Sequence, residues 1–416
     1  MPTSVLIIGG GVIGLCTAYY LWKNGVKVEV VEKGEVGAGC SSRNAGLIVP
    51  SHIIPLAAPG IIAKGVKWLF NPQSPFYVKP QLNWEFYSWL RSFRRACSES
   101  QMQKSVPMLN QLLQASAALF RDLSHSEIQD FGYKRKGLIM LYKSDRGLSE
   151  GLQLAEMAMQ KRQAVSIFNR EQLHQRFSNI HRSVAGGIYF HQDAHINPEV
   201  LLNNLGEFLK KNGVQIHTQT GVQGWEKGRR RISNVLTDKG AFSADEFVLA
   251  GGAWSPAIVR DLSLKLSLQA GKGYSVDFPL PNRQFEIPLL LGEARMAVTP
   301  LEDRLRVAGT MELSGIDLSV NPRRVQAMLR ILPDYLPALE SKPIEPAKIW
   351  AGLRPCTPDG LPLLGRIRNF KNLMVATGHA MLGISLAPIT GKLVADVILA
   401  RPPEVDLTAL RVERFN

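Results

Sequence analysis

The chain has 416 residues, of which 45% are hydrophobic and 20% charged, and a formal net charge of +14. This composition is typical of a soluble globular protein of two or three domains and excludes disordered and fibrous chains. The charge would suit a nucleic acid, an anionic membrane surface or a small anionic ligand. We expect no nucleic acid, because no zinc-finger, RNA-binding or helix-turn-helix signature is present. The four cysteines match neither a metal site nor a disulfide framework, which favours a reducing cytoplasm.

The first predicted elements form a β-α-β unit at the start of the chain. An apolar strand over 4–8 leads into a run of glycines, a helix follows over 12–24, and a second strand covers 26–31. Glycines inside the apolar stretch and the lack of a basic segment before it do not fit a signal peptide. No later run reaches the ~18 apolar residues of a membrane-spanning helix, so we expect a soluble or peripheral protein.

Helices and strands alternate through the middle of the chain. Apolar residues at three- and four-residue intervals predict helices over 83–100, 107–123 and 151–163. A strand is predicted over 137–142. Asn197 as N-cap and Pro198 in the first turn predict a helix over 198–212.

The remaining elements return to an α/β pattern. Strands are predicted over 214–218, 247–250 and 373–376, a β-rich stretch over 270–306, and a final helix over 384–399. The basic run 227–231 lies between two strand-like runs, which is typical of a solvated hairpin turn.

This layout predicts an α/β fold in which a discontinuous Rossmann-like domain is interleaved with a second domain. We assign residues 1–60, 185–268 and 345–416 to the dinucleotide-binding domain. Residues 61–184 and 269–344 are assigned to an α+β substrate domain built on a large mixed or antiparallel sheet.

A glycine turn in the first β-α-β unit predicts a dinucleotide site. Gly9 permits the tight turn, Gly11 lets the backbone approach a pyrophosphate, and Gly14 permits close packing of helix and strand. The N-terminus of the helix supplies free N–H groups and a positive dipole for the phosphates. Glu32 ends the second strand, where its carboxylate can accept both ribose hydroxyls. Since no second fingerprint occurs, we expect FAD rather than a separate NAD(P)H domain.

Three further segments are suited to lie against the same cofactor. The loop over 39–47 has small and hydroxyl side chains that allow a bulky ligand to approach. The strand end over 250–255 could border the pyrophosphate or be an ordinary strand-to-helix turn. The helix that begins near Gly383 can direct its dipole at the flavin, whereas His379 alone is more typical of packing than of catalysis.

The segment around Arg354 can bind an anion. An arginine held between apolar residues and prolines offers a rigid fork for a carboxylate. The alternative is a structural salt bridge. Both remain open from the residues alone.

Together these residues resemble the D-amino-acid oxidase family of FAD enzymes, and within it the D-amino-acid dehydrogenase branch. Four stretches carry the resemblance over essentially the whole chain. They are the glycine fingerprint, 55–60 with Lys67-Trp68-Leu69-Phe70, 271–275, and 352–355 with 357–360.

The resemblance implies roles for individual residues. Arg354 would pair with the substrate carboxylate and Tyr274 would lie in the pocket, and these are the predicted catalytic residues. His52, in a variable pocket segment, and His379 complete the predicted substrate-binding set, whereas the role of Arg43 is open. FAD is expected to be non-covalent, because Cys356 does not lie where related sarcosine oxidases attach it. The predicted cofactor-binding residues are Gly9, Gly11, Val12, Ile13, Gly14, Glu32, Lys33, Cys40, Ser41, Ser42, Asn44, Ala45, Gly46, Leu47, Val222 (through its backbone, to adenine), Gly251, Gly252, Trp254, Gly352, Gly378, His379, Leu382, Gly383, Ile384 and Ser385.

The implied activity is oxidation of a D-amino acid, with D-proline or a hydroxyproline isomer among the candidates. The α-hydrogen would leave as hydride to flavin N5, with electrons passing to a quinone or another respiratory carrier instead of oxygen. Two alternatives stay open: a glycine or sarcosine oxidase that uses O₂, and a flavin-binding subunit that needs partners for activity. We expect a cytoplasmic protein, and the aromatic segment 67–95 either contacts the inner face of the cell membrane or packs in the core.

Overall fold

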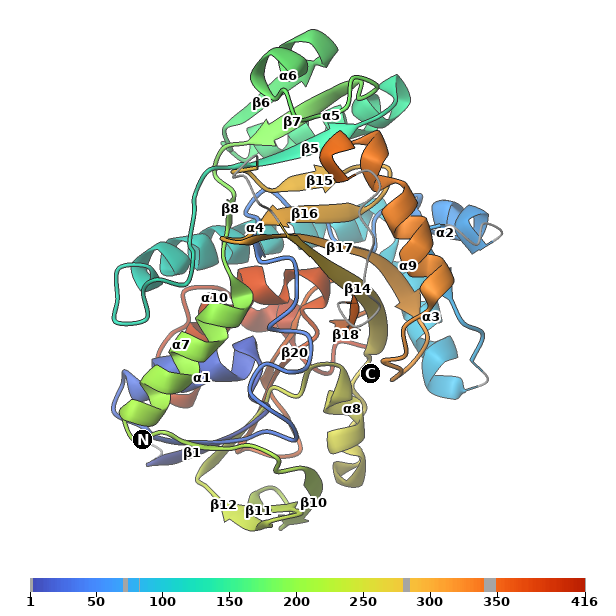
Figure 1. The fold of residues 1–416 in the computed structure, drawn as a ribbon. Coiled ribbons are helices and arrows are strands. Elements are labelled where there is room, and N and C mark those ends of the chain that lie inside the picture. The colour runs from blue at the N-terminus through green and yellow to red at the C-terminus, as the bar shows by residue number, and fades with distance from the viewer. Residues whose placement is uncertain (1–2, 70–73, 82, 280–284, 340–348, 416) are drawn as a thin grey trace.

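Two β-sheets organise the chain, one of six strands and one of nine (Figure 1). The computed structural model describes residues 3–69, 74–81, 83–279, 285–339 and 349–415. Phe70 of the predicted aromatic segment and the predicted boundary at 344/345 lie outside these residues.

The six-stranded sheet contains the N-terminal strand in its interior. Its neighbours are parallel except at the β19–β20 edge. Because both faces are covered, the three central strands Ser4–Ile8, Glu246–Leu249 and Leu373–Thr377 are nearly continuous apolar runs, whereas Lys27–Val31 and Gln215–His217 alternate with polar residues. The strands, in spatial order, are β19 (Leu363–Arg366), β20 (Leu373–Thr377), β13 (Glu246–Leu249), β1 (Ser4–Ile8), β2 (Lys27–Val31) and β9 (Gln215–His217).

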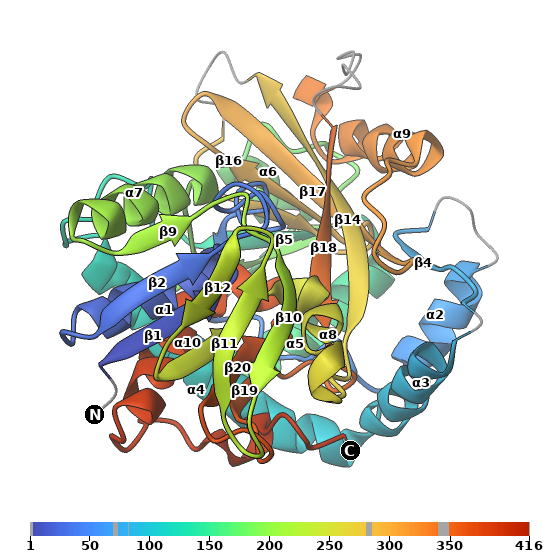
Figure 2. The same ribbon diagram turned by 90° about the horizontal axis from the view of Figure 1, so that it is seen from below.

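Helices cover one face of this sheet and a small antiparallel sheet covers the other (Figure 2). At Gly391 the last helix passes so close to Cys16 of the first that an added Cβ would lie 2.5 Å from the Cys16 backbone carbon. The helices are α1 (Val12–Trp22), α4 (Glu99–Leu123), α7 (Pro198–Lys211) and α10 (Gly383–Ile398), and the small sheet is β10 (Val222–Lys227), β11 (Ile232–Thr237) and β12 (Gly240–Ser243).

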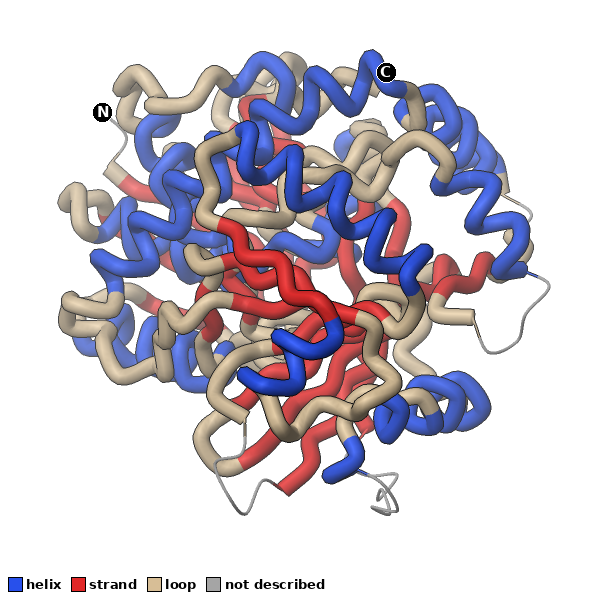
Figure 3. The backbone as a smooth tube through the Cα atoms, turned by 90° about the horizontal axis from the view of Figure 1, so that it is seen from above, coloured by secondary structure: helices blue, strands red, loops and turns tan. Residues whose placement is uncertain are grey.

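The nine-stranded sheet is mostly antiparallel and forms the other half of the molecule. Its main path is β18 (Ile349–Cys356), β14 (Gln269–Pro279), β17 (Arg304–Leu313), β16 (Met296–Pro300), β15 (Leu289–Leu291), β5 (Leu138–Tyr142), β7 (Gly186–Phe190) and β6 (Val165–Asn169), and β4 (Phe76–Val78) pairs with β17. Around this sheet lie α2 (Ile61–Leu69), α3 (Trp84–Ala96), α5 (Asp145–Gln160), α6 (Arg170–Arg176) and α9 (Pro322–Arg330) (Figure 1). The view from above shows helices, in blue, around the strands, in red (Figure 3). The short pair β3 (Leu47–Ile48) and β8 (Ala194–His195) and the four-residue helix α8 (Ser255–Ile258) complete the described elements that concern the site.

The predicted strands and the helix over 198–212 are confirmed to within two residues, as is the hairpin turn over 227–231. Two predicted helix starts are wrong. The helix predicted from residue 107 begins at Glu99, because the Ser98 side chain caps it by accepting the Gln101 N–H, and Pro107 lies inside. The helix predicted from residue 151 begins at Asp145, because Ser144 caps it in the same way.

The domain boundaries predicted at residues 185 and 345 differ from the membership of the sheets. β7 and β18 follow these boundaries but belong to the nine-stranded sheet. The physical reason is that both strands pair antiparallel with neighbours of that sheet, β5 and β14 respectively, and local sequence does not reveal a strand's partner.

One helix departs from the expectation that no later segment is apolar enough to span a membrane. The segment Ala380–Ile398 meets the length and composition of a span, with a mean hydropathy of 1.5. Its most apolar stretch is 67% buried within the protein, where α10 packs against α1 and α4. It is therefore a core helix in this fold.

Arg306 joins the nine-stranded sheet to the loop that follows the glycine turn. Its side chain is 1% exposed, and it forms a bidentate pair with Asp277 through two bonds of 2.8 Å. The remaining nitrogen donates to the carbonyl oxygens of Ser42 and Asn44, each at 3.2 Å. This guanidinium therefore fixes the loop relative to the sheet.

We expect Arg306→Leu to lower the free energy of unfolding by about 3 kcal/mol, because it leaves a partly buried carboxylate and two carbonyl oxygens without their donor. Urea unfolding followed by circular dichroism measures this. Arg304→Leu is the matched control, since Arg304 also contacts Asp277 but is 26% exposed, and it should cost less than about 1 kcal/mol. Equal losses in the two variants would contradict the role of Arg306.

Candidate active site

A cavity of about 1230 Å³ lies between the two sheets. On one side it is bordered by residues at the carboxyl ends of β1, β2, β13 and β20, where parallel α/β sheets bind nucleotides. On the other side it is bordered by residues of β14 to β18 and β5. Both predicted domains therefore contribute to one site.

The glycine turn has the shape that a pyrophosphate requires. Gly9 has a φ of +115°, and an added Cβ would lie 2.5 Å from the carbonyl oxygen of Ala250. Gly14 meets the Gly9 carbonyl so closely that no side chain fits. Gly11 is the N-cap of α1 and provides no side-chain cap, so the first turn faces the cavity with its N–H groups. These residues fit a dinucleotide.

Glu32 lies at one end of the cavity with its carboxylate held by backbone. Oε2 accepts the Gly10 N–H at 2.7 Å and Oε1 accepts the Gly34 N–H at 2.9 Å. A carboxylate oxygen can accept further bonds, so the group remains able to bind the hydroxyls of a ribose. Lys33 and Val222 border the same end.

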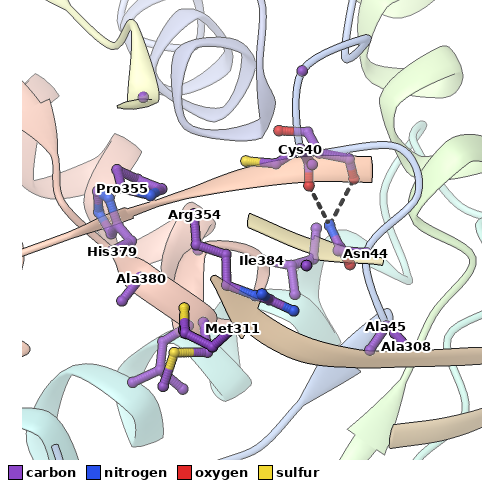
Figure 4. A pocket seen from close by; sticks show the side chains of 18 of the residues that line it. Cys40, Asn44, Ala45, Ala308, Met311, Arg354, Pro355, His379, Ala380 and Ile384 are labelled. Atoms are coloured by element: carbon purple, nitrogen blue, oxygen red, sulfur yellow. Dashed lines mark hydrogen bonds between the residues drawn. The ribbon is translucent and has the colours of Figure 1, made fainter. Parts of the chain in front are cut away.

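The loop after β2 is folded onto the cavity by its own polar groups. Asn44 Nδ2 donates to the carbonyl oxygens of Ser41, at 2.7 Å, and Cys40, at 3.3 Å (Figure 4). Ser41 Oγ in turn accepts the Val12 N–H of α1 at 3.1 Å. The loop and the glycine turn are therefore directly connected.

Two later segments also border the site. Gly251, Gly252 and Trp254 border the cavity after β13, and the segment Leu382–Ile384 borders it at the start of α10. Leu382, the N-cap of α10, makes no side-chain cap, so the N-terminal dipole of this helix is directed at the cavity. Four predicted cofactor residues lie behind the lining, namely Gly14, Ser42, Gly378 and Ser385.

Arg354 projects from β18 into the cavity (Figure 4). Its Nη1 donates to the carbonyl oxygen of Thr310 at 2.9 Å, and Gly273 on the adjacent strand leaves the space that its guanidinium occupies. Burial lowers the pKa of Arg354 from its ordinary value. In the described part of the chain no carboxylate forms an ion pair with Arg354, so the structural salt bridge is the wrong alternative. The other nitrogens of the fork are available to an anionic ligand.

Tyr274 borders the cavity, as predicted, but its side chain is packed in a core cluster. Alternation along β14 puts Gly273 on the face of Arg354 and Tyr274 on the opposite face, within a core cluster that includes Val276 and Tyr335. Its hydroxyl accepts the Asn321 N–H at 3.2 Å, and burial raises its pKa, with a further rise from Glu312. The hydroxyl is therefore already engaged by Asn321, and the catalytic role of Tyr274 stays a prediction.

The two predicted histidines differ. His379 borders the cavity, but its Nε2 is 3.0 Å from Thr390 Oγ1 inside α10, and burial lowers its pKa to about 3. Its ring is therefore neutral and its Nε2 is engaged by Thr390, and its substrate contact stays a prediction. His52 borders the cavity, and among the described residues its one hydrogen-bond partner is Ser51 Oγ, 3.1 Å from its Nδ1.

Several cavity residues were not predicted from the sequence. Thr310, which holds Arg354, has a φ of +64°, a conformation that is rare for a β-branched residue and has no sequence signal. Arg295 lies in the stretch 270–306, for which the sequence predicts only a β-rich pattern. The charged residues that border the cavity are Glu32, Lys33, Arg43, Arg94, Arg295 and Arg354. With five basic groups and one acid, the described lining favours an anionic ligand.

Comparison with known proteins agrees with this site. Residues 4–397 match the model of the family described as FAD dependent oxidoreductase (DAO). The chain is 30% identical over 418 residues to a D-amino acid dehydrogenase of Vibrio atlanticus (strain LGP32), covering 99% of this chain and 100% of that protein. A D-amino acid dehydrogenase of Bradyrhizobium diazoefficiens is also 30% identical, with 99% of each chain covered.

Solved structures share the fold. Glycine oxidase from Geobacillus kaustophilus superposes with a TM-score of 0.80 at 24% identity, covering 99% of this chain and 98% of that one. L-proline dehydrogenase from P. horikoshii gives 0.77 at 19% identity, covering 99% and 97%.

We expect Gly9→Ala to abolish FAD retention, because the added methyl group would collide with the Ala250 carbonyl at a backbone angle that also disfavours alanine. The flavin absorbance of the purified protein measures this. Gly25→Ala is the control: its φ is +75° but an added Cβ meets nothing within 4 Å, so only the strain of roughly 1 kcal/mol remains. A Gly9→Ala protein with full flavin content would contradict the assignment.

Proposed function

The chain belongs to the DAO family of FAD-dependent oxidoreductases, and from that premise we propose that it oxidises D-amino acids to imines. The relatives named D-amino acid dehydrogenase support this substrate class, because they match over their whole length. Cyclic imino acids such as D-proline or hydroxy-D-proline are candidate substrates within the class.

One observation carries the proposal: Arg354 projects into the cavity, and in the described part of the chain no carboxylate pairs with its fork. A guanidinium in a buried site binds a carboxylate through two parallel bonds and favours it over a neutral group. Thr310 fixes one nitrogen, so the direction of the fork is set before a ligand arrives. An amino acid held in this way has its α-carbon at a fixed distance from the fork.

The residues near Arg354 favour a mechanism without a side-chain base. Within the described lining, Glu32 is the only carboxylate, and its bonds to Gly10 and Gly34 hold it at the glycine turn. His379 is neutral and bonded to Thr390. We infer that the neutral amine lone pair of the substrate assists loss of the α-hydrogen. When bound, FAD would supply the acceptor for that hydrogen as hydride.

We propose a quinone or related carrier as the electron acceptor, with the α2–α3 edge in contact with a membrane. Trp89 and Phe86 of this edge are buried, so part of the aromatic segment is core. Trp84, however, is 77% exposed and Val66 52% exposed. The arginines Arg91, Arg94 and Arg95 of α3 are exposed, which suits an anionic lipid surface.

Arg354→Leu should raise KM for the amino acid roughly 100-fold, the equivalent of about 3 kcal/mol for a charged hydrogen-bonded pair, while FAD stays bound. The measurement is anaerobic bleaching of the flavin against a panel of D- and L-amino acids. An amine that lacks the carboxylate should reduce the flavin of the wild type and of Arg354→Leu equally slowly. An unchanged KM would refute the role of Arg354, and bleaching by glycine with rapid peroxide formation in air would favour a glycine oxidase.

The protein should co-sediment with anionic lipid vesicles and release from them as salt rises. Trp84→Asp should weaken this binding severalfold, because it replaces an exposed aromatic by a charge repelled from the surface. Ile167→Asp is the matched control, since Ile167 is 45% exposed on β6. Equal binding to neutral and anionic vesicles would contradict membrane contact through the α2–α3 edge. An equal loss of binding in Trp84→Asp and Ile167→Asp would contradict it as well.

A further inference from the structure

A chain of three polar side chains leads from the cavity into the protein interior. His52 borders the cavity, and its Nδ1 lies 3.1 Å from Ser51 Oγ. Ser51 Oγ lies 2.5 Å from Asp193 Oδ2, and the Ser51 N–H donates to Asp193 Oδ1 at 3.1 Å. Asp193 is completely buried and Ser51 is 1% exposed, so only the histidine end is accessible from the cavity.

This geometry is compatible with two arrangements of the protons. With Asp193 ionised, Ser51 donates to Asp193, His52 Nδ1–H donates to Ser51, and His52 Nε2 carries a lone pair. With Asp193 protonated, each bond reverses, and His52 presents an N–H at Nε2 to the cavity. The two arrangements differ by one proton and need no movement of heavy atoms.

The three side chains lie beside the part of the cavity wall that β5, β15 and β16 form. Val49, three residues before His52, packs with Met140 of β5 and Leu290 of β15. Arg295, whose charge acts on His52, immediately precedes β16. The Arg354 side chain crosses β14 at Gly273 and bonds to Thr310 of β17, the direct neighbour of β16. Arg354 and Arg295 therefore border neighbouring parts of the cavity.

We propose that Ser51, His52 and Asp193 form a proton relay to a quinone-class electron acceptor that binds at the His52–Arg295 end of the cavity. This rests on the proposed function, because it assigns a place to the acceptor of that reaction. The carbonyl oxygen of the acceptor would take its proton from His52 Nε2.

The step balances. Oxidation of a neutral amino acid to its imine releases two electrons and two protons, and reduction of a quinone to a quinol consumes the same. One proton leaves the substrate with the two electrons as hydride, and the second leaves from the amine nitrogen. The relay supplies the second quinol proton: His52 gives up Nε2–H, Ser51 passes its hydrogen to Nδ1, and Asp193 passes its own to Ser51. Asp193 is left ionised. A proton from solvent then enters at His52 Nε2 and passes back through Ser51 to reprotonate Asp193.

The charges around the relay are consistent with this sequence. Burial raises the pKa of Asp193 to about 7, against the lowering effect of its two bonds from Ser51, so both proton arrangements are populated near neutrality. Burial, with a contribution from Arg295, lowers the pKa of His52 to about 4, so the ring stays neutral while protons pass. The other basic groups nearby are Lys134 and Lys136, which surround His195 on β8.

The test is reoxidation of enzyme whose flavin has been reduced with dithionite, so that it does not depend on the amino-acid substrate. With a short-chain ubiquinone, Ser51→Ala and Asp193→Asn should each slow reoxidation at least ~10-fold and remove its solvent deuterium effect. With ferricenium, which takes electrons without protons, both variants should match the wild type. Wild-type quinone reduction should fall as pH rises above about 7, where Asp193 loses its proton, and Ser51→Ala should flatten this profile.

Ser166→Ala is the control, because it also removes a hydroxyl next to a histidine, 2.7 Å from His191 Nε2, but on an exposed strand.

Flavin-free protein gives a second readout: the infrared band of a protonated carboxyl should titrate near pH 7 in the wild type and be absent from Asp193→Asn. Equal slowing with both acceptors, unchanged quinone reduction in Ser51→Ala, or no such carboxyl band would each overturn the relay. None of these results depends on which amino acid is the substrate.

Discussion

The contact between the nine-stranded sheet and the loop after the glycine turn determines the rest of the site. Three backbone carbonyls of this loop are held by the sheet: Arg306 binds those of Ser42 and Asn44, and Thr299 donates to that of Ala45 at 2.6 Å. The other end of the loop is tied to α1 through Ser41. A shift of one sheet relative to the other would therefore also displace the glycine turn.

This coupling explains why the cavity has distinct ends. The six-stranded sheet contributes backbone N–H groups and a single held carboxylate, which suits a nucleotide. The nine-stranded sheet contributes side chains from separate strands, with Arg354 on β18 and Arg295 immediately before β16. In the proposed function these positions belong to two reactants that never need to touch each other.

The sequence predicted those parts of the fold and site that depend on local geometry. The glycine turn, Glu32 and the capped helix after Asn197 have signals within a few residues, and the structure has them where expected. The core packing of the Tyr274 side chain could not be predicted, because a one-residue step along a strand reverses the face, and no local signal tells which face is packed. Thr310 and Asp193 were missed for another reason: their importance comes from partners 44 and 142 residues away.

The order of strands in the six-stranded sheet has a consequence for biosynthesis. β1 is made first, but its neighbour β13 and the next strand, β20, are made hundreds of residues later, and α10 completes the packing on α1. A nascent chain therefore carries a finished glycine turn against which Ala250 and the last helix have yet to pack. Cofactor capture belongs to the end of translation, and until then the apolar faces of β1 and α1 depend on chaperones or on temporary contacts for protection.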